Sequence, residues 1–198
     1  GYHDIFVAMV GPKGKFIWAI SAGGIWEDYG GKISVDNIGN SYITGQSGGG
    51  MTLGTITHTS KGSTDIYVAK VDPNGKFTWA VSAGGSLADS GIAISVDGSE
   101  NSYMMGSFKN TATFGTTTLT SKGSEDIFVA KINPKGNFTW AVSAGGTSEV
   151  LAWVIAMDNM GNNYVTGAFK DQATFGTTTL TSEGDSDIFI WKLSAGMP

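Results

Sequence analysis

The chain has 198 residues, of which 40% are hydrophobic and only 15% charged, and its formal net charge is −5. This length is enough for one domain with a sizeable core, so we predict a single domain over 1–198. The lack of cysteine excludes disulfides and thiolate chemistry. The lack of a Lys/Arg cluster argues against nucleic acid as a partner, and no apolar run is long enough for membrane insertion.

An internal repeat organises the chain. Copies begin at Asp4, Asp65, Asp126 and Asp187, so the period is 61 residues. The same spacing separates Trp18, Trp79 and Trp140. Three full repeats cover 4–64, 65–125 and 126–186, and a partial repeat covers 187–198. Such a period indicates an array of equal structural units.

Each copy contains four predicted strands, which the second copy shows in chain order. The strand "DIYVAKV" (65–71) is followed by the turn "DPNG" and the strand "KFTWAVS" (76–82). Pro73 presets the first turn position, and Gly75 supplies the positive φ that this hairpin needs. After the connection "AGGSLADSG" come "IAISVD" (92–97) and "SYMMGSF" (102–108). The Thr-rich segment that ends the copy can carry a short extra strand, and no helical period is found.

The strands are apolar on both faces. In "DIFVAKI", Ile127 and Val129 share one face, whereas Phe128, Ala130 and Ile132 share the other. A sheet with one face in water would alternate more cleanly, so we predict small sheets stacked face to face around an axis. The predicted fold is all-β, a β-propeller-like array of three four-stranded repeats.

A family resemblance supports this fold. The phrases "DIFVAKINPKGNFTWAVSAGG", "AISVDGSENSYMMGSF" and "ATFGTTTLTSKGS" resemble the SBBP-type β-propeller repeat of bacterial, mostly secreted or surface proteins. The resemblance covers almost the whole chain in three copies that keep their register. It implies a propeller fold and an extracellular or cell-surface location. It implies no activity, because that family is defined by its repeat rather than by a catalytic residue.

No constellation of catalytic or metal-binding residues recurs in the repeat. We interpret His3 and His58 as surface histidines, and no serine has a plausible base and orienting acid. Asp36, Asp97 and Asp158 precede turns that have too few carboxylates for calcium loops, so we expect each side chain to close its own turn. The repeated tryptophans are expected in the core rather than as sugar platforms. We therefore expect no catalytic residue, no metal and no cofactor.

The chain ends carry one strand too many for self-closure. A propeller ring closes with four to eight blades, and three units are too few. "FIWAIS" at the N-terminus matches the strand that the last blade lacks, which predicts strand exchange at the chain ends. "DIFVAM" at 4–9 is then left over as a duplicate of "DIFIWKL". Since an unpaired strand edge is a template for another chain, we expect another subunit to complete the blade.

The residues of this predicted assembly interface fall into three groups. The donated apolar residues are Ile188, Phe189, Ile190 and Trp191. Their counterparts or competitors at the N-terminus are Asp4, Ile5, Phe6 and Val7. Aromatic and apolar gains that distinguish the outer units from the central one add Trp26, Tyr29, Leu151 and Trp153 as flanking contacts. Buried repacking within each outer unit is the competing interpretation of these gains.

The predicted function is a non-enzymatic, extracellular, self-assembling structural protein whose subunits join through their terminal strands. Two assemblies fit: a head-to-tail filament, which we favour slightly, and a dimer that forms one six-bladed ring. The alternative is a secreted ligand-binding propeller module whose partner is a surface glycan. An enzyme is the weakest interpretation.

Overall fold

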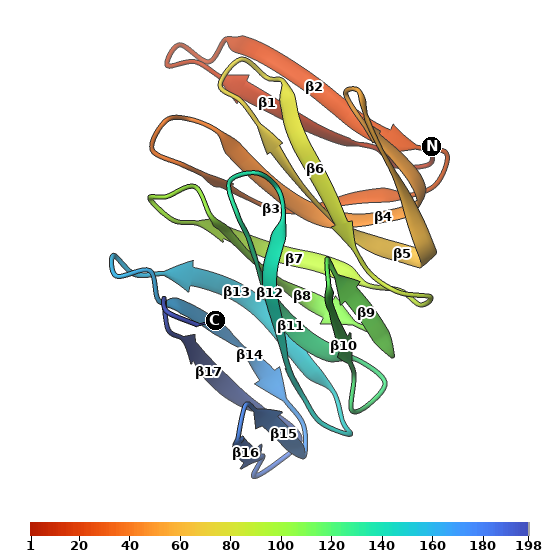
Figure 1. The fold of residues 1–198 in the computed structure, drawn as a ribbon, viewed down its shortest axis with the longest axis vertical. Coiled ribbons are helices and arrows are strands. Elements are labelled where there is room, and N and C mark those ends of the chain that lie inside the picture. The colour runs from red at the N-terminus through yellow and green to blue at the C-terminus, as the bar shows by residue number, and fades with distance from the viewer. Residues whose placement is uncertain (198) are drawn as a thin grey trace.

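The structure, a computed structural model, describes residues 1–197, which contain 17 β-strands and no helix. The prediction of an all-β fold is confirmed. The strands form successive small antiparallel sheets that follow one another from the N-terminal to the C-terminal end of the array (Figure 1). Accordingly, none of the described residues belongs to a helix long and apolar enough to cross a membrane.

Two complete blades occupy the middle of the array, and each contains four strands in the predicted order. Blade 1 contains β3 (Asp28–Val35), β4 (Ser41–Leu53), β5 (Ile56–Val71) and β6 (Phe77–Ala83). Blade 2 contains β7 (Ser90–Val96), β8 (Ser102–Phe108), β11 (Asp126–Ile132) and β12 (Phe138–Gly145). Each blade therefore runs from the middle of one sequence repeat into the next.

The two ends of the array carry incomplete blades. The N-terminal hairpin pairs β1 (Ile5–Val10) with β2 (Phe16–Gly24), which correspond to the third and fourth strands of a blade. The C-terminal blade pairs β13 (Val150–Met157), β14 (Asn163–Phe169) and β17 (Asp187–Leu193), which correspond to the first three strands. The hairpin and β17 lie at opposite ends (Figure 1), and no sheet closes into a ring. Strand exchange therefore does not occur within the described chain, and it stays a prediction about two chains.

The Thr-rich segments form hairpins that pair with, or bridge to, the end of the fourth strand of the preceding unit. These are β9 (Thr111–Phe114) with β10 (Thr117–Thr120), and β15 (Gln172–Phe175) with β16 (Thr178–Thr181). β15 pairs with β12 of blade 2, and the end of β4 pairs in the same way with β2. An isolated bridge joins Gly84, after β6, to Thr113 of β9. The sequence predicted one short extra strand here, and the structure shows two.

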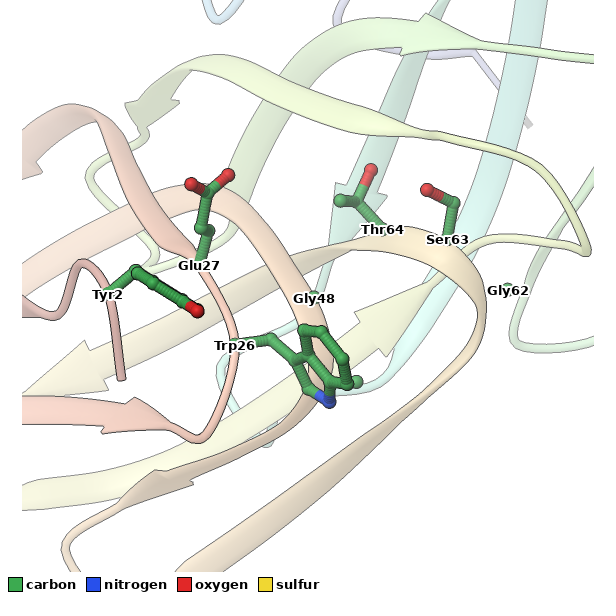
Figure 2. A pocket seen from close by; sticks show the side chains of 8 residues that line it. Tyr2, Trp26, Glu27, Gly48, Gly62, Ser63 and Thr64 are labelled. Carbon is green, nitrogen blue, oxygen red and sulfur yellow. The ribbon is translucent and has the colours of Figure 1, made fainter.

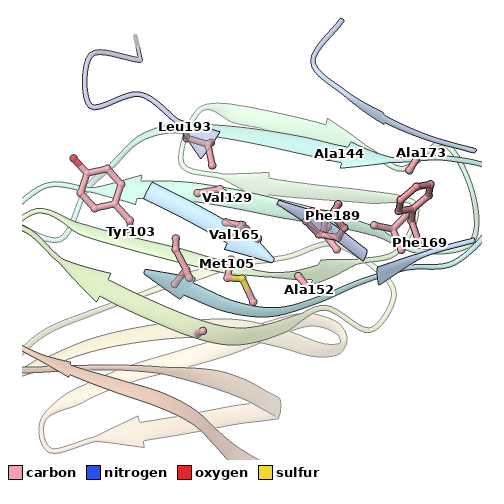
Figure 3. Packing of buried hydrophobic residues seen from close by; sticks show 14 residues of the cluster. Tyr103, Met105, Val129, Ala144, Ala152, Val165, Phe169, Ala173, Phe189 and Leu193 are labelled. Carbon is pink, nitrogen blue, oxygen red and sulfur yellow. The ribbon is translucent and has the colours of Figure 1, made fainter. Parts of the chain in front are cut away.

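The hydrophobic core lies at the junctions between blades. Ile127 and Val129 pack against residues of the C-terminal blade such as Val165 and Phe189 (Figure 3). Phe128 belongs to the cluster on the other side, together with residues of blade 1. The predicted division of each strand into two apolar faces is thus confirmed, because each face contacts a different neighbouring blade.

The repeated aspartates close turns, as the sequence predicted. Asp36 Oδ1 accepts the backbone N–H groups of Ile38 at 3.0 Å and Asn40 at 2.9 Å, and its Oδ2 accepts the Tyr42 hydroxyl at 3.2 Å. Burial acts to raise the pKa of Asp36, but hydrogen bonds from Asn40 and Ile38 outweigh it and lower the pKa. The same bonds recur at Asp97 and Asp158.

The repeated tryptophans pack against the core clusters without being fully buried, and Trp18 and Trp79 also bond to the next blade. Each is only partly buried, on the fourth strand. The Trp79 indole N–H donates to the Pro134 carbonyl of the next blade at 3.1 Å, and the ring lies against Gly136 of the same turn. Trp18 makes the equivalent bond to Pro73 at 2.9 Å. The expectation of core tryptophans is therefore only partly correct, because one edge of each ring faces solvent.

Candidate assembly interface

An apolar face is uncovered at the N-terminal end of the array. Phe6 is 77% exposed, whereas the residues at the same repeat position, Tyr67 and Phe128, are 1% and 0% exposed. Val10 and Phe16, which pair across β1 and β2, are also exposed. We call Phe6, Val10 and Phe16 the N-face. In blades 1 and 2 the equivalent side chains pack on the preceding unit, so the N-face lacks the neighbour that covers it elsewhere.

A second apolar face is uncovered at the C-terminal end. Ile188 and Ile190 are 72% and 74% exposed, although their equivalents Ile127 and Val129 are each 0% exposed. Across the sheet, Leu151 aligns with Ala168 and Ile188, because both outer strands pair with Ala168 of β14.

On the same sheet, Val154 aligns with Ile190, because both pair with Thr166 of β14. Both Val154 and Ile190 are exposed. We call Leu151, Val154, Ile188 and Ile190 the C-face. It is the surface on which the following blade would pack.

The two end faces correspond to the two sides of an interior junction. Between blades 1 and 2, Ile66 and Val68 share a cluster with Phe128 and Ala130. The C-face residues Ile188 and Ile190 occupy the repeat positions of the first pair, and Phe6 occupies that of Phe128. The C-face and the N-face therefore carry the same types of apolar residue as the two sides of an interior junction.

Both terminal strands also have an unpaired backbone edge. In blade 2, β11 pairs with β8 on one side and β12 on the other. Its equivalents β1 and β17 each pair on one side, with β2 and β14 respectively. Their remaining N–H and C=O groups can bind an added strand.

The structure brings only part of the predicted interface together. Phe6 lies on the N-face, and Ile188, Ile190 and Leu151 lie on the C-face at the opposite end.

The other predicted interface residues lie elsewhere. Ile5 and Val7 point into the cluster with blade 1. Phe189 and Trp191 pack on Phe175, with ring centroids 4.7 and 5.8 Å away. Asp4 is about half exposed beside the N-terminal amine, at 3.9 Å. Trp153 is half exposed on β13, where the pairing with β14 shifts register.

Trp26 and Tyr29 lie near the N-terminal segment and belong to neither end face as defined above. Trp26 lines a cavity described below, and the Tyr29 ring stacks on His3 with centroids 5.3 Å apart.

The sequence interpretation missed Val10, Phe16 and Val154. Val154 had a visible signal, because the same position holds Lys32 and Ala93 in the other copies.

Two groups with shifted pKa values, Asp89 and His58, are at least partly buried in the array. Burial raises the pKa of Asp89 to about 6, although its carboxylate accepts the backbone N–H groups of Gly85 and Lys109. Burial lowers the pKa of His58, and the negative charges of Asp65 and Asp28 partly oppose that effect. His58 Nε2 is buried without a hydrogen-bond partner, so the prediction of a surface histidine at this position was wrong. The described residues include no group of three or more His, Asp or Glu side chains placed to hold a metal ion.

Comparison with known proteins supports the repeat architecture. No family model matches the chain. An uncharacterized WD repeat-containing protein of Acanthamoeba polyphaga mimivirus is 23% identical over 220 aligned positions. The match covers 93% of this chain and 15% of the viral protein's length. The chain is an all-β repeat protein with a propeller-like array of blades.

Proposed function

We propose that this protein is a non-enzymatic structural repeat protein whose copies join head to tail, with the C-face of one copy on the N-face of the next. One observation carries the proposal. The positions of Phe6, Ile188 and Ile190 are covered at every interior junction and exposed at the two ends. A unit of the same repeat has the shape and apolar character to cover them. The unpaired edges of β1 and β17 offer a second, separate place where backbone bonds to another chain can form.

We propose an open filament rather than a six-bladed dimer because the two faces differ. The N-face comes from a two-stranded hairpin and the C-face from a three-stranded sheet. A contact between two different patches propagates unless a rotation closes it. The resemblance to the SBBP-type repeat supports an extracellular or cell-surface setting for this assembly.

Particle mass against concentration tests the proposal, with electron microscopy for shape. We expect filaments from the unchanged chain. Phe6→Ser removes the main aromatic of the N-face, and Ile188→Ser with Ile190→Ser removes two residues of the C-face. Each variant alone should be a folded monomer, and an equimolar mixture should form dimers and stop there, since each supplies one intact face.

Ile38→Ser is the matched control. Ile38 is also exposed, but it lies in a turn, and the second copy has Ser99 at this position. The control should still assemble. A Phe6→Ser variant that remains dimeric would mean that the C-face pairs with itself. A monomeric unchanged chain at high concentration would refute self-assembly.

A further inference from the structure

The first unit contains an open cavity beside the segment that connects β2 to β3. The cavity has a volume of about 650 Å³ and is lined by residues that include Tyr2, Trp26, Glu27, Gly48 and Thr64. Figure 2 shows Trp26 and Glu27 on the connection before β3, with Thr64 and Ser63 on β5 across from them. The cavity lies where β4 carries the sequence "SGG" (47–49) in place of "FKN" (108–110) and "FKD" (169–171).

In the other two units this place holds a lysine ion pair. Lys109 Nζ lies 3.5 Å from Glu125 in the second unit, and Lys170 Nζ lies 3.4 Å from Glu149 in the third. The equivalents of Lys170 and Glu149 in the first unit are Gly48 and Glu27. The first unit therefore keeps the carboxylate and lacks the ammonium group.

The first and third units share one backbone hydrogen bond at this point. Gly48 N–H donates to the Glu27 carbonyl at 2.9 Å, and Lys170 N–H donates to the Glu149 carbonyl at the same distance. The side chains of Glu27 and Glu149 are 53% and 54% exposed. Glu27 Oε1 instead has His3 Nδ1 at 3.7 Å.

Trp26 adds an aromatic wall that the other units lack. A Cβ atom on Gly49 would lie 2.3 Å from Trp26 Cδ1, so only glycine lets the indole rest at this position. Gly49 also has a φ of 71°, in the left-handed region that favours glycine. The equivalent of Trp26 is Leu87 in the second unit and Ser148 in the third. An indole attracts an organic cation through its ring face, and a carboxylate attracts the cation through its negative charge.

We propose that this cavity binds a primary alkylammonium group, the chemistry of a lysine side chain. The ammonium group pairs with Glu27, as Lys170 pairs with Glu149, and the alkyl chain lies along Trp26. The proposal does not rest on self-assembly, because neither Trp26 nor Glu27 belongs to the N-face or the C-face. Two sources can supply this group: a lysine of a partner protein or a free alkylamine.

Titration followed by NMR of the tryptophan indole N–H signals tests the proposal. The Trp26 signal is assigned as the one lost in Trp26→Phe. The probes are Nα-acetyl-lysine amide, n-butylammonium, Nα-acetyl-norleucine amide and methyl glucoside. We expect both amines to shift the Trp26 signal when the source is a free amine, and the lysine amide alone to shift it when the source is a peptide. Equal binding of the norleucine amide, binding of the glucoside alone, or no binding of either amine would overturn the proposal.

Three variants locate the site. Glu27→Gln should weaken amine binding about fivefold, the upper range for one exposed ion pair. Glu149→Gln, the matched change in the third unit, should leave binding unchanged. Gly48→Lys should abolish binding, because the chain then supplies its own ammonium group, as the third unit does. A Cβ atom at Gly48 would lie 3.3 Å from Trp26 Cβ, so the spectrum of this variant must first show a folded protein. Unchanged affinity in Glu27→Gln would overturn the proposal whatever the behaviour of Gly48→Lys.

Discussion

Blade 2 and the two ends of the array are built from the same sequence phrases, yet their surfaces differ. "DIFVA" of β11 is buried on both faces, whereas "DIFVA" of β1 exposes Phe6 and buries Ile5. The difference arises from the neighbours: β11 lies between two blades and β1 has one on a single side. An identical phrase thus forms core in one place and exposed surface in another. The contribution of a residue to stability should follow its neighbours rather than its repeat position.

The sharpest test replaces phenylalanine by alanine at the same repeat position in two different copies. Phe128→Ala should lower the free energy of unfolding by about 3–5 kcal/mol, because it leaves a cavity between blades 1 and 2. Phe6→Ala should change the stability of the monomer by less than about 0.5 kcal/mol, because the ring already faces solvent. Denaturant unfolding at low protein concentration measures both. Equal effects would mean that repeat position, rather than the neighbouring blade, sets the energy.

A tryptophan at a blade junction should have an intermediate effect. Trp79→Ala removes a partly buried ring and its bond to the Pro134 carbonyl, so we expect a loss of about 2–3 kcal/mol, less than for a fully buried aromatic residue. Trp153→Ala removes a half-exposed ring of the C-terminal blade and should cost less than about 1 kcal/mol. Thermal unfolding compares the two. A larger loss at Trp153 would place that ring in a buried contact.

A gain in stability is expected at a partly buried polar residue of the first unit. Leu119 and Leu180 occupy the repeat position of His58. His58→Leu removes a buried nitrogen that has no partner, so it should stabilise the protein by about 1 kcal/mol at neutral pH.

The pH dependence of the same variant follows from the lowered pKa of His58. The unfolded chain binds the proton first, so the native chain should lose stability as pH falls through the unfolded pKa of about 6.5. His58→Leu should lose less stability than the unchanged chain when the pH is lowered from about 7.5 to about 5.5, one unit on either side of that value. The raised pKa of Asp89 acts in the opposite direction in both proteins, so the difference between them isolates His58. Parallel pH curves would contradict this assignment.

Local features of the fold were predictable because they depend on neighbours in the chain. Gly75 has the expected positive φ, of 80°, in its hairpin turn. Asp36 closes its turn through backbone atoms no more than four residues away. The alternation of Ile127 and Phe128 showed that both faces of β11 would be covered. These predictions needed only strand and turn geometry.

Features that depend on contacts between units were not predictable. The sequence did not show that the hairpin of one unit pairs with the fourth strand of the preceding unit, since no local pattern encodes that partner. The partial exposure of Trp79 follows from its place at the outer edge of a blade. The "SGG" departure was visible, but the cavity beside Trp26 depends on where three separate segments meet.

The backward reach of these hairpins gives the chain a direction. β15 pairs with β12, and the end of β4 pairs with β2, so in each case the later segment docks on one that is already made. A chain that leaves the ribosome N-terminus first therefore never has to wait for the surface on which its next hairpin docks. Biosynthesis and assembly of the blades can proceed together, one unit at a time. For the same reason, shortening the chain from its C-terminal end removes only segments that dock, whereas shortening it from the N-terminal end removes the surface that a remaining hairpin needs.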